Sequence, residues 1–268
     1  MRNSLTLILL LMLTACSIFS SKDEKSAAGK GESAERIYAQ ATEQMSDANY
    51  AGAIKLFEKL QSRYPYGRYA QQAQMEIAYA YYKQSEPEAA LSAVERFIKQ
   101  YPKSSHVDYA YYLKGLVNFD DDLGLFGEGF HPDLSERNPK APREAYDAFE
   151  DLVTRFPNSK YAADSKLRMQ YLSNALARHE TQIASYYLRR GAYVAAVNRA
   201  NGVLIEYPHA PATRDALRIM VQAYDAMGLK SLSDDSRRVL DKNFAKNGDR
   251  SVVKQPSENK KSWWHFWK

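Results

Sequence analysis

The chain has 268 residues, with 37 lysines and arginines against 32 aspartates and glutamates, so its formal net charge is +5. This excess is too small to argue for a nucleic-acid partner, and the length allows one or two domains with a substantial core. The chain has many alanines, 20 tyrosines, only 12 glycines and almost no alternating β-branched runs, which together predict an all-α protein.

The N-terminus is typical of a lipoprotein signal peptide. Arg2 precedes an apolar run over residues 5–13, which is too short to cross a membrane, and Leu-Thr-Ala-Cys follows and ends at Cys16. This tetrapeptide resembles the bacterial lipobox, in which the cysteine becomes the lipidated first residue. We therefore expect removal of residues 1–15, with N-acyl and S-diacylglycerol groups on Cys16. The alternatives are a buried free thiol or an ordinary signal peptide that contains a cysteine.

The residues that follow Cys16 predict a membrane-held tether. Cys16 is the only cysteine, so an intramolecular disulfide is impossible. Residues 16–33 are small and polar and include glycine, as in flexible linkers. Ser17, in place of aspartate, resembles the signal that sends such lipoproteins to the periplasmic leaflet of the outer membrane. Several acyl chains on one cysteine would hold the protein there durably.

Four aromatic–proline pairs divide the chain into repeats. Small or apolar residues lie twelve, eight and five residues before each proline, and offsets of four and three place them on one helical face. Each segment is therefore predicted to be an amphipathic helix that ends just before its proline. The pairs are Tyr64-Pro65, Tyr101-Pro102, Phe156-Pro157 and Tyr207-Pro208, and the preceding residues are Ala53, Phe57, Leu60; Ala90, Val94, Phe97; Ala145, Phe149, Leu152; and Ala196, Ala200, Val203.

A partner helix precedes these segments. Twelve residues before three of the alanines lie Ala41, Ala78 and Ala184, small residues suited to a close helix crossing, and Tyr81 and Tyr187 come three residues after two of them. This register matches the tetratricopeptide helix–turn–helix repeat. It predicts a superhelix of about five helical pairs over residues 34–246, divided roughly into 33–66, 67–102, 104–157, 159–208 and 210–246, the last being the weakest.

Three segments depart from the regular repeat. Between Gly115 and Ala145 the spacing is longer than expected, and residues 118–142 contain three glycines and three prolines, which predicts a long loop. Residues 159–190 lack both glycine and proline, which predicts one long helical stretch joining the third and fourth repeats. Residues 247–268 are predicted to be a flexible basic and aromatic tail.

No catalytic or metal site is expected. The chain has no nucleophile elbow, phosphate-binding glycine loop or zinc-protease motif, and its five histidines show no metal-ligand spacing. A calcium loop starting at Asp120 would need an acid at its twelfth position, where His131 stands instead. Asp120, Asp121 and Asp122 are therefore predicted to lie in a solvated acidic loop, and the protein is expected to be neither an enzyme nor dependent on a cofactor.

Two groups of tyrosines crowd the first helices of neighbouring repeats. Because adjacent residues on a helix cannot all face inward, some of these tyrosines are expected to be exposed and available to partners. The alternative is that most belong to the core between repeats. The residues are Tyr79, Tyr81 and Tyr82, and Tyr109, Tyr111 and Tyr112.

Three longer stretches are more specific than the repeat pattern. They are RYPYGRYAQQAQMEIAYAYYK (63–83), the loop pattern FDDD…FG…ERNP, and RGAYVAAVNRANGVLIEYP…ATRDAL (190–217). With the lipobox, they resemble the BamD (ComL-type) lipoprotein family of the outer-membrane β-barrel assembly machinery, over about residues 37–227. The resemblance implies a periplasmic scaffold that binds the periplasmic repeats of the barrel-forming subunit through its C-terminal half. It also implies companion lipoproteins and binding of unfolded outer membrane protein precursors, with no nucleic-acid partner.

Two residues match family positions associated with contact to precursors or partners. Tyr64 stands in RYP, where the alternative is an aromatic residue that closes the turn of the first repeat. Arg199 stands in VNRA on the second helix of the fourth repeat, where it would either flank the core or bind a carboxylate of a partner. Another helical-repeat lipoprotein, organising peptidoglycan, division or DNA-uptake proteins, is the alternative function.

All three tryptophans lie at the C-terminus, in KKSWWHFWK. Trp263, Trp264 and Trp267 stand beside Lys260 and Lys261, a composition typical of membrane-surface anchors. The tail lies beyond the part of the chain that carries the family resemblance. Three roles remain open for it: contact with the membrane or a neighbouring subunit, folding back over an apolar face of the last repeat, or no role.

Overall fold

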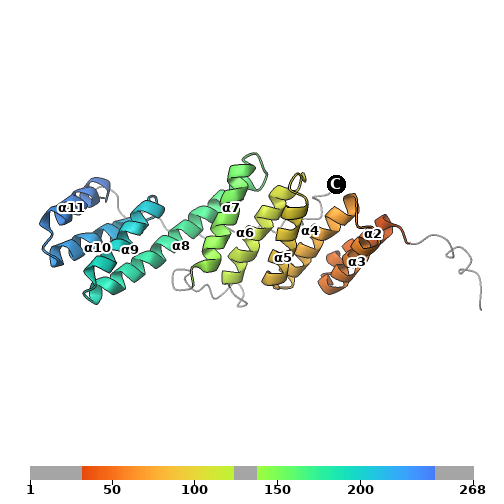
Figure 1. The fold of residues 1–268 in the computed structure, drawn as a ribbon, viewed down its shortest axis with the longest axis horizontal. Coiled ribbons are helices and arrows are strands. Elements are labelled where there is room, and N and C mark those ends of the chain that lie inside the picture. The colour runs from red at the N-terminus through yellow and green to blue at the C-terminus, as the bar shows by residue number, and fades with distance from the viewer. Residues whose placement is uncertain (1–31, 124–137, 245–268) are drawn as a thin grey trace, which may run out of the picture. The chain divides into compact units, whose positions relative to one another are not determined.

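The computed structural model of the chain describes residues 32–123 and 138–244, which form ten helices and no strand. The expected signal peptide, Cys16, most of the tether and the tryptophan-containing tail lie outside the described residues. The helices are α2 (Ala34–Ser46), α3 (Tyr50–Arg63), α4 (Arg68–Lys83), α5 (Pro87–Gln100), α6 (Val107–Leu123), α7 (Lys140–Arg155), α8 (Ala162–Arg189), α9 (Tyr193–Glu206), α10 (Thr213–Ala226) and α11 (Lys230–Phe244) (Figure 1). Five consecutive helical pairs result, as the sequence predicts.

The chain divides into two compact units, one ending at Ala73 and one beginning at Gln74, and each is described by itself. In the first unit, α2 and α3 form an antiparallel pair. The Ser33 hydroxyl accepts from the amide of Arg36 at 3.2 Å and begins α2, while the Asn49 side chain accepts from the amide of Gly52 at 3.1 Å and begins α3. Such N-caps satisfy amides that have no partner within the helix. The buried residues of the pair are Ile37, Ala41, Met45, Ala53, Ile54, Phe57 and Leu60.

The predicted helix ends are confirmed in both units. Helices α3, α5, α7 and α9 each end one residue before an aromatic–proline pair, and the aromatic residue caps the helix with φ between −127° and −131°. Its amide still bonds to the carbonyl four residues back, at 2.8–3.0 Å. All twelve residues of the predicted small and apolar register, and Ala41, Ala78 and Ala184 on the partner helices, are 0% exposed. The proline-based register therefore identifies the packed faces.

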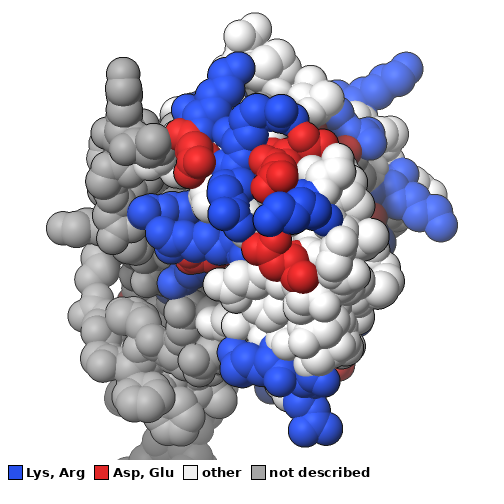
Figure 2. Space-filling view, turned by 90° about the vertical axis from the view of Figure 1, so that its left-hand side faces the viewer, with Lys and Arg blue, Asp and Glu red and all other residues white. Residues whose placement is uncertain are grey.

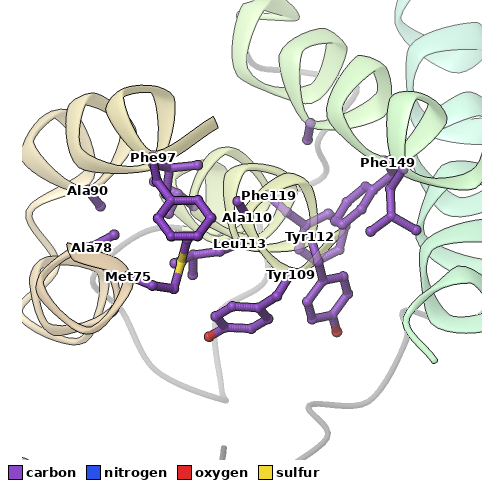
Figure 3. Packing of buried hydrophobic residues seen from close by; sticks show 14 of the residues in the cluster. Met75, Ala78, Ala90, Phe97, Tyr109, Ala110, Tyr112, Leu113, Phe119 and Phe149 are labelled. Atoms are coloured by element: carbon purple, nitrogen blue, oxygen red, sulfur yellow. The ribbon is translucent and has the colours of Figure 1, made fainter. Parts of the chain in front are cut away.

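The second unit contains two hydrophobic clusters. One lies between α4 and α8 and is rich in aromatic rings; Phe97, Tyr109, Tyr112, Phe119 and Phe149 converge in it (Figure 3). The other lies between α8 and α10 and is built mainly from alanine and aliphatic residues, with Tyr207 at its edge. Helix α8 contributes Leu172 to the first cluster and Leu176 to the second. This single helix is the long helical stretch that the sequence predicts.

The structure corrects the predicted start of the long loop. Residues 118–123 belong to α6, so Asp120, Asp121 and Asp122 lie on a helical backbone and not in a loop. The helix continues because Phe119 is 2% exposed and packs against Phe149 and Tyr171, with ring centroids 6.5 and 5.9 Å apart. An inward-facing aromatic residue at this position stabilises the last turns of α6.

For the tyrosines of α4 and α6, the structure confirms the alternative that most belong to the core, and none of the six is among the exposed large side chains. Tyr109 and Tyr112 are buried, and Tyr79, Tyr81, Tyr82 and Tyr111 are half-buried against the first cluster. A first helix of an inner repeat contacts helices on several sides, so side chains pointing in quite different directions can all be covered. No helix within the described residues is both long and apolar enough to cross a membrane.

Candidate partner-binding surface

Arg199 lies on α9 with its side chain partly in solvent. Its neighbours Ala196 and Ala200 are fully buried, whereas the arginine side chain is 49% exposed. Its Nη1 donates to Oε2 of Glu180 on α8 at 2.9 Å. The structure therefore places Arg199 beside the packed face of α9, with a carboxylate of the same chain already bound.

Glu180 binds a second guanidinium as well. Nη2 of Arg143, at the start of α7, donates to Oε1 of Glu180 at 3.1 Å, and Nη1 of Arg143 lies 3.7 Å from a carboxylate oxygen of Glu206. The Glu180 side chain is only 12% exposed, so the carboxylate relies on these two cations for the interactions that water would otherwise supply. Two positive and two negative groups thus meet where α7, α8 and α9 come together.

These four charged residues line a groove of about 470 Å³. The other lining residues are small or polar, apart from the half-buried ring of Tyr187 on α8, and they are Ala195, Asn198 and Gly202. Tyr207, at the end of α9, is buried beside this charged group, and burial raises its pKa to about 12. The groove combines charges of both signs with open space, a composition suited to recognising a partner with a complementary charge pattern.

A second groove lies one repeat earlier, between α5, α6 and α7, with a volume of about 510 Å³. Five carboxylates line it and only one cation, Lys114, which pairs with Glu95 at 2.9 Å. The carboxylates belong to Glu88, Glu95, Glu144, Asp147 and Asp151. Across the described part of the chain, no group of three or more histidine, cysteine, aspartate or glutamate side chains is arranged to hold a metal ion.

Tyr64 belongs to the first unit. It caps α3, and its hydroxyl donates to the backbone carbonyl of Glu32, before α2, at 3.0 Å. Glu32 also accepts from Lys59 at 2.6 Å, and this hydrogen bond lowers its pKa. These contacts fit the alternative in which Tyr64 closes the first helical pair. Two residues further on, Tyr66 is 90% exposed, which sequence reasoning did not single out.

Sequence reasoning also missed the partners of Arg199. Glu180 lies on the preceding helix α8 and Arg143 lies one helix earlier on α7, so no local spacing connects the three residues. The only sequence signal is that Glu180 lies four residues, about one turn, before Ala184 on the predicted long helix. Their meeting depends on how α7, α8 and α9 pack.

Comparisons with known proteins agree with this fold. The sequence profile of the YfiO family, described as outer membrane lipoprotein, matches residues 30–239. The chain is 43% identical over 263 residues to the outer membrane protein assembly factor BamD of Neisseria meningitidis serogroup A, covering 98% of each chain. It is 40% identical over 233 residues to BamD of Xylella fastidiosa (87% of this chain, 78% of the relative) and 34% identical over 255 residues to BamD of Haemophilus influenzae (95% of each).

The two kinds of match differ at the C-terminus. The family profile ends at residue 239, before the tail, as the sequence predicts. The alignment to the Neisseria protein covers 98% of the chain, so it extends into residues 245–268.

Proposed function

The chain belongs to the YfiO family of outer membrane lipoproteins, which includes its BamD relatives, and we propose that it acts in the assembly of outer membrane proteins. The relatives named as assembly factors match it over nearly the whole chain, which supports this role. In this proposal Cys16 carries the lipid, the periplasmic leaflet of the outer membrane is the site of anchoring, and the protein is a scaffold and not an enzyme.

The partner at the second unit is, in this proposal, the barrel-forming subunit of the assembly machinery, bound through its periplasmic repeats. The observation that carries this is the position of Arg199, half-exposed at a groove and held by a carboxylate that it shares with Arg143. A planar guanidinium in this setting can bind a carboxylate of a partner without a large rearrangement. Unfolded barrel precursors and companion lipoproteins are further partners, and the exposed Tyr66 beside Tyr64 offers a precursor-contact candidate in the first unit.

We expect Arg199→Ala to reduce co-purification of the barrel-forming subunit from detergent-solubilised membranes. The variant should stay folded, because Arg199 is half-exposed and Arg143 still pairs with the carboxylate of Glu180 at 3.1 Å. The matched control is Arg218→Ala on α10, whose side chain is 48% exposed and pairs with Asp215 outside the groove.

Equal recovery of the barrel-forming subunit with wild type, Arg199→Ala and Arg218→Ala would contradict the assigned role of Arg199. Recovery of an unrelated set of envelope proteins with the wild-type chain would instead contradict the proposed function. Melting curves of all three proteins separate either result from a loss of folding.

A further inference from the structure

The last two helical pairs expose bulky aliphatic side chains that the groove of Arg199 does not use. On α9, Val194 is 64% and Ile205 is 71% exposed, and on α11, Leu232 and Val239 are each 44% exposed. Val194 and Ile205 are separated by roughly three helical turns, and Leu232 and Val239 by roughly two, so each pair lies on one side of its helix. We call these four residues the α9–α11 apolar face.

The repeat register shows that Leu232 and Val239 face the α9 side of α11. Gly191 and Gly228 have positive φ values of 74° and 72° and precede α9 and α11 at equivalent positions. Counted from these glycines, Leu232 takes the place of Ala195 and Val239 the place of Gly202. Ala195 and Gly202 line the groove that α9 shares with α7, the second helix of the preceding pair. By the same geometry, the two residues of α11 face the preceding second helix, which is α9.

The same counting places Val194 on the α11 side of α9. Ser85 has a positive φ of 58° and precedes α5 as Gly191 precedes α9, so Val194 corresponds to Glu88. Glu88 lines the groove that α5 shares with the following second helix, α7. Both α9 and α11 pack on α10, so the two apolar edges border one surface. In the earlier grooves the equivalent residues are the charged Glu88 and the small Ala195 and Gly202. Between α9 and α11 they are Val194, Leu232 and Val239.

An apolar surface at this end of the array needs a cover. Valine, isoleucine and leucine side chains gathered on one exposed surface are less favourable in water than against another apolar surface. Figure 2 looks onto the side on which α11 lies and shows lysines, arginines and acidic residues interleaved next to a broad uncharged area. The segment that leaves this end is residues 245–268, which contains all three tryptophans and Phe266.

We propose that residues 260–268 fold back onto the α9–α11 apolar face and bury their tryptophan rings against Val194, Ile205, Leu232 and Val239. The length of the connecting chain allows this. Helix α11 has 15 residues and is about 22 Å long, and an extended chain covers that distance in about seven residues. Trp263 follows Phe244 by more than twice that number of residues.

The charges of the two segments agree with this docking. Asp235 lies one turn from both Leu232 and Val239 on α11, where it pairs with Arg238 and can also accept from a lysine placed beside docked rings. Lys260, Lys261 and Lys268 flank the four aromatic residues of the tail. Because the tail is attached to α11, its effective concentration at the face is in the millimolar range, which favours the intramolecular contact over a bimolecular one.

Tryptophan fluorescence tests the proposal directly, because the tail holds every tryptophan of the chain. The protein is the full mature chain with Cys16→Ser, which needs no detergent. We expect its emission to be shifted to the blue of the urea-unfolded chain and to be protected from quenching by iodide. The double variant Leu232→Asp, Val239→Asp should shift the emission to that of the unfolded chain while its far-ultraviolet circular dichroism stays helical, and Val194→Asp should shift it in the same direction.

The matched control is Leu167→Asp on α8, a residue that is 55% exposed and lies outside this face, and it should leave the emission unchanged. Wild-type emission like that of the unfolded chain would overturn the proposal. If that emission moved to the blue only on adding vesicles of phosphatidylethanolamine and phosphatidylglycerol, the tail would be a lipid contact. A blue-shifted emission that ignores the substitutions on both α9 and α11 would place the tail elsewhere and equally overturn the proposal. None of these readouts depends on the barrel-forming subunit.

Discussion

At the scale of single residues, Glu180 limits what Arg199 can bind. The sequence placed an arginine beside two packing alanines and suggested that it binds a carboxylate. In the structure the positive charge of Arg199 is already balanced within the chain, because Oε2 of Glu180 accepts from Arg199 at 2.9 Å. A carboxylate brought by a partner therefore has to share or displace Glu180, which makes Glu180 an internal competitor for Arg199.

We expect Glu180→Gln to strengthen binding of an acidic partner. The amide keeps the shape of the side chain but removes the negative charge that balances Arg143 and Arg199. A gain of about 1 kcal/mol corresponds to roughly fivefold tighter binding, and the gain should shrink as salt is added. Titration of the purified periplasmic repeats of the barrel-forming subunit at low and high salt measures both effects.

The control for net charge is Glu150→Gln, an exposed position on α7 outside the groove. It changes the charge of the chain by the same amount and should leave the affinity unaltered. Weaker binding by Glu180→Gln would mean that Glu180 helps to position Arg199 for the partner and does not compete with it.

At the level of helices, the packing of α6 on α7 depends on Gly115. A Cβ built at this position would lie 2.4 Å from the ring of Phe149, which is fully buried and has no room to retreat. We expect Gly115→Ala to destabilise the fold by about 1–3 kcal/mol, because overpacking outweighs the gain of up to about 1 kcal/mol that alanine brings to a helix interior. Urea unfolding followed by circular dichroism measures the difference.

Gly202 provides the opposite case on α9. A Cβ there meets nothing within 4 Å, so Gly202→Ala should stabilise the chain by about 0.5–1 kcal/mol. The free energy of unfolding is the suitable measurement for this variant, because Gly202 also lines the groove of Arg199 and its substitution could change partner binding as well. If both glycine substitutions stabilised the chain equally, the close contact between Gly115 and Phe149 would be wrong.

The helices could be predicted from the sequence where proline and small residues mark them. Proline ends a helix by local sterics, and an alanine that recurs in each repeat indicates where two helices cross closely. Both signals act over short sequence distances. The end of α6 could not be predicted in this way. Its last turns depend on Phe119, which packs on Phe149 and Tyr171 and lies under the Arg168 guanidinium, 4.8 Å from the ring centroid. Contacts with residues so far along the chain leave no periodic signal.

The same distinction applies to the candidate site. Arg199 was found through a family motif, and its place on α9 followed from the helical register. The groove, the shared carboxylate of Glu180 and the contribution of Arg143 come from three helices that meet only after folding. Tyr64 was found in the same way as Arg199, and its hydrogen bond to the carbonyl of Glu32 likewise became visible only in the structure.

At the scale of the second unit, buried tyrosines link its stability to alkaline pH. Burial raises the pKa of Tyr109, Tyr112 and Tyr161, and the hydroxyl of Tyr112 also donates to Asp164 at 2.7 Å. Burial likewise raises the pKa of Tyr207 to about 12. An unfolded tyrosine ionises near pH 10, so the unfolded chain releases its protons first. The stabilisation is therefore complete below about pH 10 and is lost as the pH rises through the folded values.

We expect the free energy of unfolding to fall steadily above about pH 10. Urea melts at pH 8, 10 and 11 measure this. The buried tyrosines should ionise only as the chain unfolds, so their tyrosinate absorbance should appear together with the loss of helical circular dichroism. Tyr207→Phe should weaken the dependence between about pH 10 and 12. Complete tyrosine ionisation near pH 10 with the helices intact would contradict the burial of these rings.

Helix α8 connects the two hydrophobic clusters of the second unit without a shared side chain. The last buried residue that α8 gives to the first cluster is Leu172, and the first that it gives to the second cluster is Leu176. The helix has neither glycine nor proline along its 28 residues. A continuous helix of this length is about 42 Å long and bends only gently. Asp164 near its start and Glu180 in its second half therefore keep a nearly constant separation. A partner that touched both clusters would meet a stiff spacer, so its own binding elements would have to match that distance and could not draw the clusters together.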